Sequence, residues 1–174
     1  MTPQPTKPLP MSALDAIRSR VSVRKYASAA LDRKTISDIV DAGRLAPTAR
    51  GAQPWEFVAV TQRPVLSRLA DLAPNGAFLR EAGAAVVVFC RETGYQLEDG
   101  SAATENILLA ATALGVGSCW VAGDKKPYAE AVRELLKVPA GLKLISIVCL
   151  GMPDGAATQK PKRPLAEVLH WETF

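Results

Sequence analysis

Hydrophobic positions recur along the chain at two different spacings, and each spacing predicts a type of element. Apolar residues at helical spacing predict helices over residues 12–19, 33–45, 64–72, 101–114 and 128–136. Alternating or continuous apolar runs predict strands over residues 55–60, 84–90 and 144–150, with a short apolar segment at 118–121. Because helices and strands interleave along the chain, we expect a mixed α/β or α+β fold around one sheet.

The helix expected over residues 101–114 is apolar nearly all round, so it is expected to be buried on several sides. Both ends of the chain lack such patterns. Residues 1–11 are rich in proline and predict a disordered or strap-like arm with no apolar signal region. Residues 151–164 are rich in proline, glycine and lysine, and residues 165–168 predict a short closing element. We expect residues 12–174 to form a single domain, since no linker divides them.

Composition narrows the class of protein. The chain has 174 residues, 48% of them hydrophobic, which fits one domain with a substantial core. Its 21 basic and 17 acidic residues give a net charge of +4, too small and too dispersed to indicate a nucleic-acid partner by itself. The longest apolar stretches are too short to span a membrane, so we expect no membrane partner.

Histidine and cysteine usage restricts the chemistry. A lone histidine, His170, excludes a metal site built on several histidines, and any hydrolase triad would depend on that one residue. Cys90, Cys119 and Cys149 lie in apolar runs without a CxxC spacing. They are interpreted as reduced, buried thiols, which favours a cytoplasmic protein.

The first segment that could carry chemistry is residues 18–25, where four cations and two hydroxyls follow a helix. In an extended chain Arg20, Ser22 and Arg24 point the same way. Two guanidinium groups beside a hydroxyl can hold a phosphate through charge-assisted hydrogen bonds. The alternative is a solvated basic face.

Three further segments have a functional and an ordinary interpretation each. Residues 46–55 hold Gln53 directly before a proline. The Gln53 amide could face a planar heterocycle, or the segment could be an ordinary connection between a helix and a strand. Residues 113–123 contain glycines that could admit a ligand or cap a helix. They follow a helix, the reverse of a Rossmann loop, so that fold is rejected. Residues 159–165 hold three cations interspersed with two prolines, which could serve a function or form a solvated, basic tail.

In this order the four segments resemble the FMN-dependent nitroreductase family. Arg20–Arg24 is similar to the Arg-Arg-Ser-x-Arg motif, and Ala46–Trp55 to A-P-S-x-x-N-x-Q-P-W. Thr104–Trp120 is similar to T-x-N-x-L-L-A-A leading into G-x-G-S-x-W, and Gly151–Pro164 to Gly-x-P followed by K-P-x-R-P. The resemblance implies an α+β, three-layer fold, with a central, mostly antiparallel sheet flanked by helices in an intertwined homodimer.

The resemblance also implies roles for individual residues. The flavin phosphate and ribityl chain would be bound by two groups of side chains: Arg20, Ser22 and Arg24, and the C-terminal clamp Lys160, Lys162 and Arg163. The backbone at Val21 would pass beside the flavin, and Gln53 would reach the ring across the dimer interface. The ring edge at N5 and O4 would be bound by backbone N–H groups of Val121, Ala122 and Gly123.

Three positions depart from the family pattern. Val21 replaces a second arginine or histidine, Gly51 replaces asparagine, and Ala122 replaces the glutamate of some members. The polar stretch over residues 91–100 is also too brief for the helical excursion that covers the active site in larger members.

The implied activity is ping-pong hydride transfer from NAD(P)H through flavin N5 to an electron-poor acceptor such as a nitroaromatic or a quinone. No catalytic side chain and no metal is expected, and Arg20 or Lys162 would face the N1–O2 edge of the ring. The helix at 102–114 would form the core of the dimer interface; the alternative is the centre of a monomer core. Two alternative functions remain: a flavin-binding module without turnover, and a small basic nucleic-acid-binding protein, although that one lacks an aromatic stacking platform.

Overall fold

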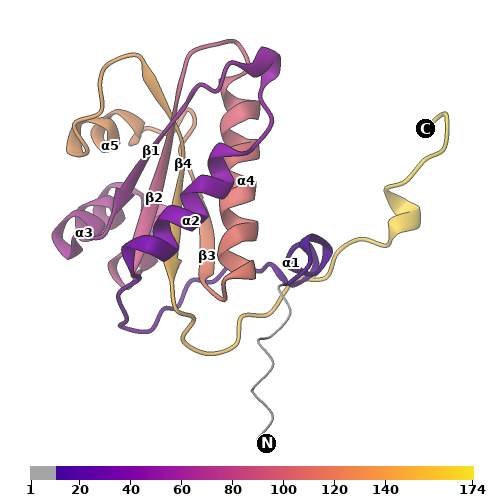
Figure 1. Ribbon diagram of the computed structural model, residues 1–174, viewed down its shortest axis with the longest axis horizontal. Helices are drawn as coiled ribbons and strands as arrows, with labels where there is room; N and C mark the ends of the chain where they lie inside the picture. Colours follow the sequence, from indigo (N-terminus) through magenta and orange to yellow (C-terminus); the bar gives the residue numbers. More distant parts are fainter. Residues whose placement is uncertain (1–10) are drawn as a thin grey trace, which may run out of the picture.

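A four-stranded sheet in the order β1-β2-β4-β3 forms the centre of the molecule (Figure 1). The structure, a computed structural model, describes residues 11–174, so the predicted arm over residues 1–11 lies almost wholly outside the described residues. The strands are β1 (Trp55–Val60), β2 (Ala84–Arg91), β3 (Gly117–Ala122) and β4 (Leu142–Gly151). The helices are α1 (Ala13–Ser19), α2 (Arg33–Arg44), α3 (Arg63–Leu72), α4 (Gln96–Ala113) and α5 (Ala129–Leu135), with 3₁₀ turns η1 (Ala49–Gly51), η2 (Pro74–Arg80) and η3 (Leu165–Glu167).

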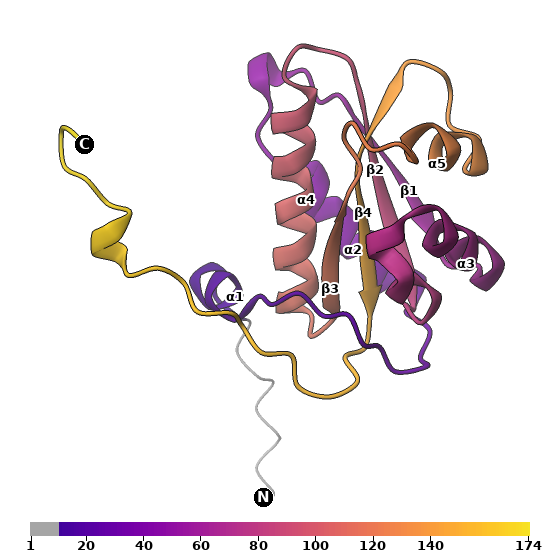
Figure 2. The same cartoon turned by 180° about the vertical axis from the view of Figure 1, so that it is seen from behind.

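All three strand pairings are antiparallel, and helices cover both faces of the sheet. Side chains of β2 alternate between two cores: Val87 and Phe89 face one, and Val86 and Val88 face the other. Helices α2 and α4 close the second core on the near side in Figure 1, and α3 and α5 close the first, nearer in Figure 2. The expectation of an α+β, three-layer arrangement is therefore confirmed.

Local capping signals explain the starts of α1 and α2. Ser12 caps α1 by accepting a hydrogen bond from the Asp15 N–H at 3.2 Å, and Asp32 caps α2 by accepting one from the Thr35 N–H at 2.8 Å. Helix α4 begins at Gln96, five residues before the predicted start. Its first turns are polar in sequence, yet Asp99 is buried against neighbouring elements, which apolar periodicity does not reveal. None of the helices within residues 11–174 is long and apolar enough to span a membrane.

Two polar side chains from the expected T-x-N motif fasten α4 to its neighbours. The Thr104 hydroxyl lies 2.8 Å from that of Ser146 on β4, and both residues are fully buried. Asn106 Nδ2 donates to the carbonyl of Ala42 on α2 at 3.0 Å. These residues therefore hold α4 between the sheet and α2, the position that its apolar sequence predicts.

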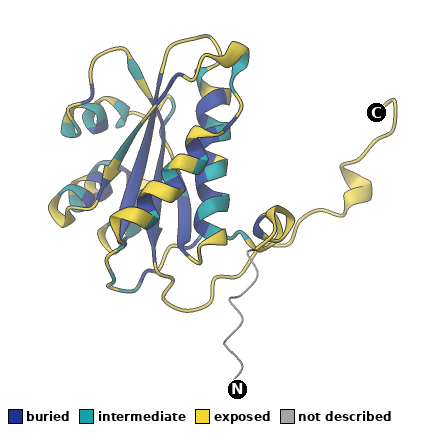
Figure 3. Ribbon diagram, in the orientation of Figure 1, coloured by how far each residue is buried: buried dark blue, intermediate teal, exposed yellow. Residues whose placement is uncertain are grey.

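Exposed apolar side chains gather on α1 and on the C-terminal tail. Leu14 and Ile17 of α1 are 60% and 53% exposed, and Trp171 is 76% exposed. Figure 3 shows that the tail is exposed along its length and runs away from the sheet. The apolar face predicted for α1 is therefore largely uncovered within one chain.

Candidate functional site

The basic segment over residues 20–26 is fixed beside the open edge of β3. The Val23 N–H donates to the carbonyl of Ser118 on β3 at 2.9 Å. At the other end of the segment, Tyr26 forms an antiparallel bridge with Pro153, just after β4. Residues distant in sequence thus meet at one corner of the sheet.

Both basic runs line one cavity of about 210 Å³. Its lining residues come from the two runs and from Thr158, which precedes the second run: Arg20, Val21, Ser22, Arg24, Thr158, Gln159, Lys160 and Lys162. Four cations and two hydroxyls around so small a space are suited to a dianionic phosphate. Arg163 does not line this cavity.

Arg20 is the most enclosed cation of this group. Its side chain is 22% exposed, and its Nε lies 3.9 Å from Oε1 of Glu105 on α4. Gln159 Nε2 donates to the backbone carbonyl of Arg20 at 3.2 Å, which ties the tail to the basic segment. Neither Glu105 nor Gln159 was predicted from the sequence, because each belongs to a helix or tail pattern that has an ordinary structural explanation.

A second cavity, of about 480 Å³, adjoins the first through Arg24, which lines both. Its other lining residues are mostly aromatic or lie at the end of β3: Asn75, Phe78, Cys119, Trp120, Val121, Ala122, Lys126 and Tyr128. A larger, aromatic space beside a small basic one suits a ligand with a planar ring at one end and a phosphate at the other. The chemistry of this donor set therefore fits FMN.

The three predicted backbone donors at the end of β3 are not equivalent. The Gly123 N–H donates to Ile145 O on β4 at 2.9 Å. In an antiparallel pair, the backbone N–H groups of successive residues point alternately toward the partner strand and away from it. The Val121 N–H therefore also points to β4, whereas the Ala122 N–H points to the open edge of the sheet. A Cβ on Gly123 would lie 2.5 Å from Cγ of Leu144, so this glycine permits close packing. Ala122 is the one of the three placed to donate to a ligand.

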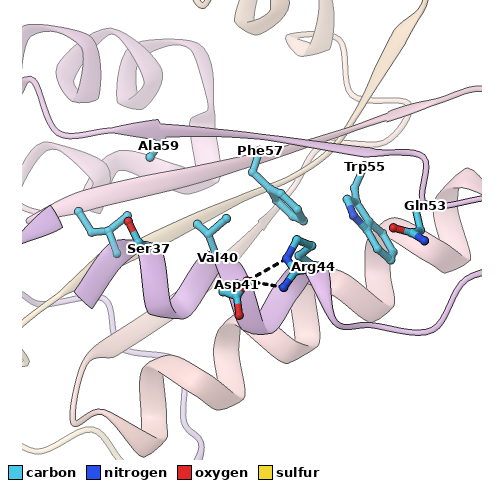
Figure 4. Close-up of a pocket in the computed structure, with 9 residues that line it drawn as sticks. Ser37, Val40, Asp41, Arg44, Gln53, Trp55, Phe57 and Ala59 are labelled. Carbon is cyan, nitrogen blue, oxygen red and sulfur yellow. Dashed lines mark hydrogen bonds and ion pairs between the residues drawn. The ribbon is translucent and has the colours of Figure 1, made fainter. Parts of the chain in front are cut away.

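Gln53 lies at the opposite edge of the sheet from these two cavities. It lines a separate cleft of about 500 Å³ between α2 and β1, where Val40, Trp55 and Phe57 form an apolar wall (Figure 4). Strand β1 is one edge of the sheet and β3 is the other. One chain therefore does not bring Gln53 to its own basic cavity.

The cysteines are free and buried, as predicted. Burial raises the pKa of the Cys119 thiol, an effect that the nearby Arg24 partly offsets. Burial likewise raises the pKa of Cys149. Neutral, enclosed thiols of this kind are not suited to nucleophilic chemistry.

Four lining residues of the larger cavity carried no sequence motif: Asn75, Phe78, Lys126 and Tyr128. Asn75 and Phe78 belong to η2, a turn that the sequence did not predict. Lys126 and Tyr128 follow the end of β3 by a few residues. Their position in the sequence could have indicated them, because a short loop that follows a binding strand stays near the ligand.

The chain matches the profile of the Nitroreductase family over residues 17–97 and 83–152. It is 38% identical over 148 residues to a protein of Archaeoglobus fulgidus provisionally named NADH dehydrogenase/NAD(P)H nitroreductase, covering 80% of this chain and 84% of that protein. A similarly named crystal structure from Parabacteroides distasonis superimposes with a TM-score of 0.88, at 32% identity over 93% of this chain and 98% of that one. A Desulfovibrio desulfuricans nitroreductase crystallised with FMN gives a TM-score of 0.82, at 31% identity over 93% and 97%. The basic and aromatic cavities thus lie on a fold shared with these proteins, and the chain belongs to the nitroreductase family.

Proposed function

We propose that this protein is an FMN-dependent oxidoreductase, which takes a hydride from NAD(P)H and passes it to an electron-poor acceptor such as a nitroaromatic or a quinone. One observation carries the proposal: Arg24 joins a basic cavity of about 210 Å³ to an aromatic cavity of about 480 Å³. This pairing matches the phosphate and the ring of FMN. A family relative from Desulfovibrio desulfuricans is a complex with FMN.

Phosphate binding falls to the smaller cavity. Arg20, Arg24, Lys160 and Lys162 supply positive charge, and the Ser22 hydroxyl supplies a neutral donor. Charge-assisted hydrogen bonds from arginine are directional, so Arg20 and Arg24 orient the phosphate, and the lysines add point charges. The ion pair to Glu105 helps to hold the Arg20 guanidinium beside this cavity.

The ring end is bound by backbone and aromatic groups. Bound FMN supplies the hydride-accepting atom N5, which removes the need for an acid–base side chain. The Ala122 N–H donates toward this end, and Arg24 provides a cation close to the ring. The sequence favoured Arg20 or Lys162 for this charge compensation. Because those two residues line the smaller cavity alone, whereas Arg24 lines the larger one as well, we assign it to Arg24.

The functional unit proposed here is a homodimer. Gln53 lies at the β1 edge, away from the basic cavity of its own chain, so it would reach a flavin only in the partner. Leu14, Ile17 and Trp171 expose apolar surface that a second copy would bury. Each flavin would then lie between two protomers.

We also propose a cytoplasmic location. Cys90, Cys119 and Cys149 are free thiols, which suits a reducing compartment. The two basic runs converge on one small cavity, so phosphate binding there explains their positive charge without a nucleic-acid partner.

Colour tests the proposal directly. The purified protein should take up FMN and absorb near ~450 nm, as oxidised flavin does. NADH or NADPH should bleach that band without oxygen, and adding a nitroaromatic or a quinone should restore it. A protein that stays colourless with added FMN would overturn the proposal, whereas a yellow protein that no nicotinamide bleaches would be a binding module.

A further inference from the structure

The open edge of β3 offers both a donor and an acceptor beside the larger cavity. Residues that face β4 alternate along β3 with residues that face outward, and Ala122 is one of the outward-facing residues. Its N–H and its carbonyl therefore both point toward the side where a ring would lie. An edge of this kind can offer a ligand either a hydrogen-bond donor or a hydrogen-bond acceptor.

Tyr128 occupies the acceptor of that pair. Its hydroxyl donates to the Ala122 carbonyl. The next N–H along, that of Gly123, donates to Ile145 O at 2.9 Å. The peptide between Ala122 and Gly123 is thus held at both of its polar atoms.

The phenol is placed to act on the ring site. Tyr128 and Ala122 both line the cavity of about 480 Å³. The Tyr128 ring is partly buried against the core on the α3–α5 side of the sheet, so its position is fixed by packing. A tyrosine hydroxyl is protonated at neutral pH, and burial raises the pKa of Tyr128 further, so the hydroxyl remains a donor.

We propose that Tyr128 is a positioning residue that keeps the β3 edge a hydrogen-bond donor toward the flavin ring and thereby favours the oxidised cofactor. This inference rests on the proposed function. It assigns to a residue outside every sequence motif a part in setting the reduction potential of the site.

Reduction of a flavin reverses the hydrogen-bonding role of N5. A hydride, one proton with two electrons, leaves NAD(P)H as NAD(P)⁺ and forms the N5–H bond. N5 accepts a hydrogen bond before this transfer and donates one after it. The Ala122 N–H matches the first state, and the Ala122 carbonyl, which would match the second, is already bonded to Tyr128.

The test is Tyr128→Phe, which removes the hydroxyl and keeps the packed ring. We expect the reduced cofactor to gain about three- to tenfold in stability over the oxidised one, the worth of one net hydrogen bond. For a two-electron couple this is a rise of about 15 to 30 mV. The measurements are the midpoint potential of bound FMN against a reference dye, and the dissociation constants of oxidised and reduced FMN.

Tyr95→Phe is the matched control, because Tyr95 is 46% exposed at the start of α4 and lines neither cavity. Its potential should equal that of the unchanged protein. An unchanged or lower potential in Tyr128→Phe, or an equal rise in Tyr95→Phe, would overturn the inference while leaving FMN binding intact. Failure of the unchanged protein to bind FMN would instead refute the proposed function.

Discussion

The carboxyl group of Asp99 accepts a hydrogen bond from the backbone N–H of Ala49 at 2.9 Å, across 50 residues of sequence. Asp99 lies in the first turns of α4 and is 4% exposed, and its second oxygen, Oδ2, is buried without a hydrogen-bond partner among the described residues. Ala49 begins η1, the turn that leads to Gln53 and β1. This one contact therefore connects the helix proposed for the dimer interface to the loop proposed to reach the partner's flavin.

Removing that acceptor should destabilise the loop. Asp99→Ala leaves the Ala49 N–H without its partner, so we expect the free energy of unfolding to fall by about 1 to 3 kcal/mol. Asp99→Asn keeps an oxygen at the same place and should lose clearly less. Urea unfolding of both variants measures the difference. Equal losses would show that the contact contributes nothing specific.

Arg24 should matter more for FMN binding than any other cation of its run. It lines both cavities, so Arg24→Ala should weaken FMN binding by about 10- to 100-fold, the range expected for losing a charge-assisted hydrogen bond. Arg18→Ala is the matched control, since the Arg18 side chain is 74% exposed and pairs only loosely with Asp15. Fluorescence titration with FMN compares the two, and similar losses in both would contradict the assigned site.

Lys160 and Lys162 should act on the phosphate alone. Replacing both with alanine should weaken FMN binding several-fold and leave the binding of riboflavin, which has no phosphate, nearly unchanged. Rising salt should weaken FMN binding to the unchanged protein more than to this variant, because screening acts on charge. Lys34→Ala serves as the control on an exposed lysine. An equal loss for FMN and riboflavin would place the ring, not the phosphate, beside these lysines.

Strands and most helices were predictable because their buried positions place apolar residues at regular spacing in the sequence. The bounds of β1 agree with the prediction residue for residue, and β2 differs only by Arg91. The early start of α4 left no such trace: Gly100 sits where a Cβ would lie 2.8 Å from Cγ1 of Ile145, and Asp99 is buried by its contact with the η1 turn. Both features depend on tertiary contacts that a local pattern does not contain.

The residues of the candidate site that belong to sequence motifs were predictable. Motif order anticipated that Arg20 and Lys160 would line one cavity, which they do. It assigned Gly123 as a ring donor, whereas the Gly123 N–H is bonded to β4. It missed Tyr128, which belongs to no motif and directly precedes α5; its role follows from the hydrogen bond that it donates to Ala122.

Alkaline pH should destabilise the protein through its buried thiols. Burial raises the pKa of Cys90 from an ordinary value near 9 to about 12, so the folded chain keeps a proton that the unfolded chain releases. Stability should therefore be complete below about pH 9 and be lost progressively toward pH 12. Urea unfolding at a series of pH values should show this decline, and Cys90→Ala should make it shallower. A decline of equal slope in that variant would assign the effect to other groups, such as Cys149.

The proposed exchange of Gln53 between protomers predicts a pattern of complementation. Suppose that Arg24→Ala and Gln53→Ala each impair FMN binding, and that the two chains are co-expressed with different tags and purified as a heterodimer. If Gln53 serves the partner's cavity, one site carries both defects and the other carries none. The heterodimer should then bind about one FMN per two chains at near-normal affinity, since its two sites are no longer equivalent.

A Gln53 that served its own chain would give the opposite result. Each cavity of the heterodimer would then carry one defect, and no site of normal affinity would remain. Both homodimeric variants provide the baseline, and the Arg18→Ala chain paired with Gln53→Ala is the control, because its exposed Arg18 lines neither cavity. That control should retain one normal site whichever chain Gln53 serves, and its other site should show the Gln53 defect alone. The measured stoichiometry thus separates a shared site from a self-contained one without reference to the acceptor that the enzyme reduces.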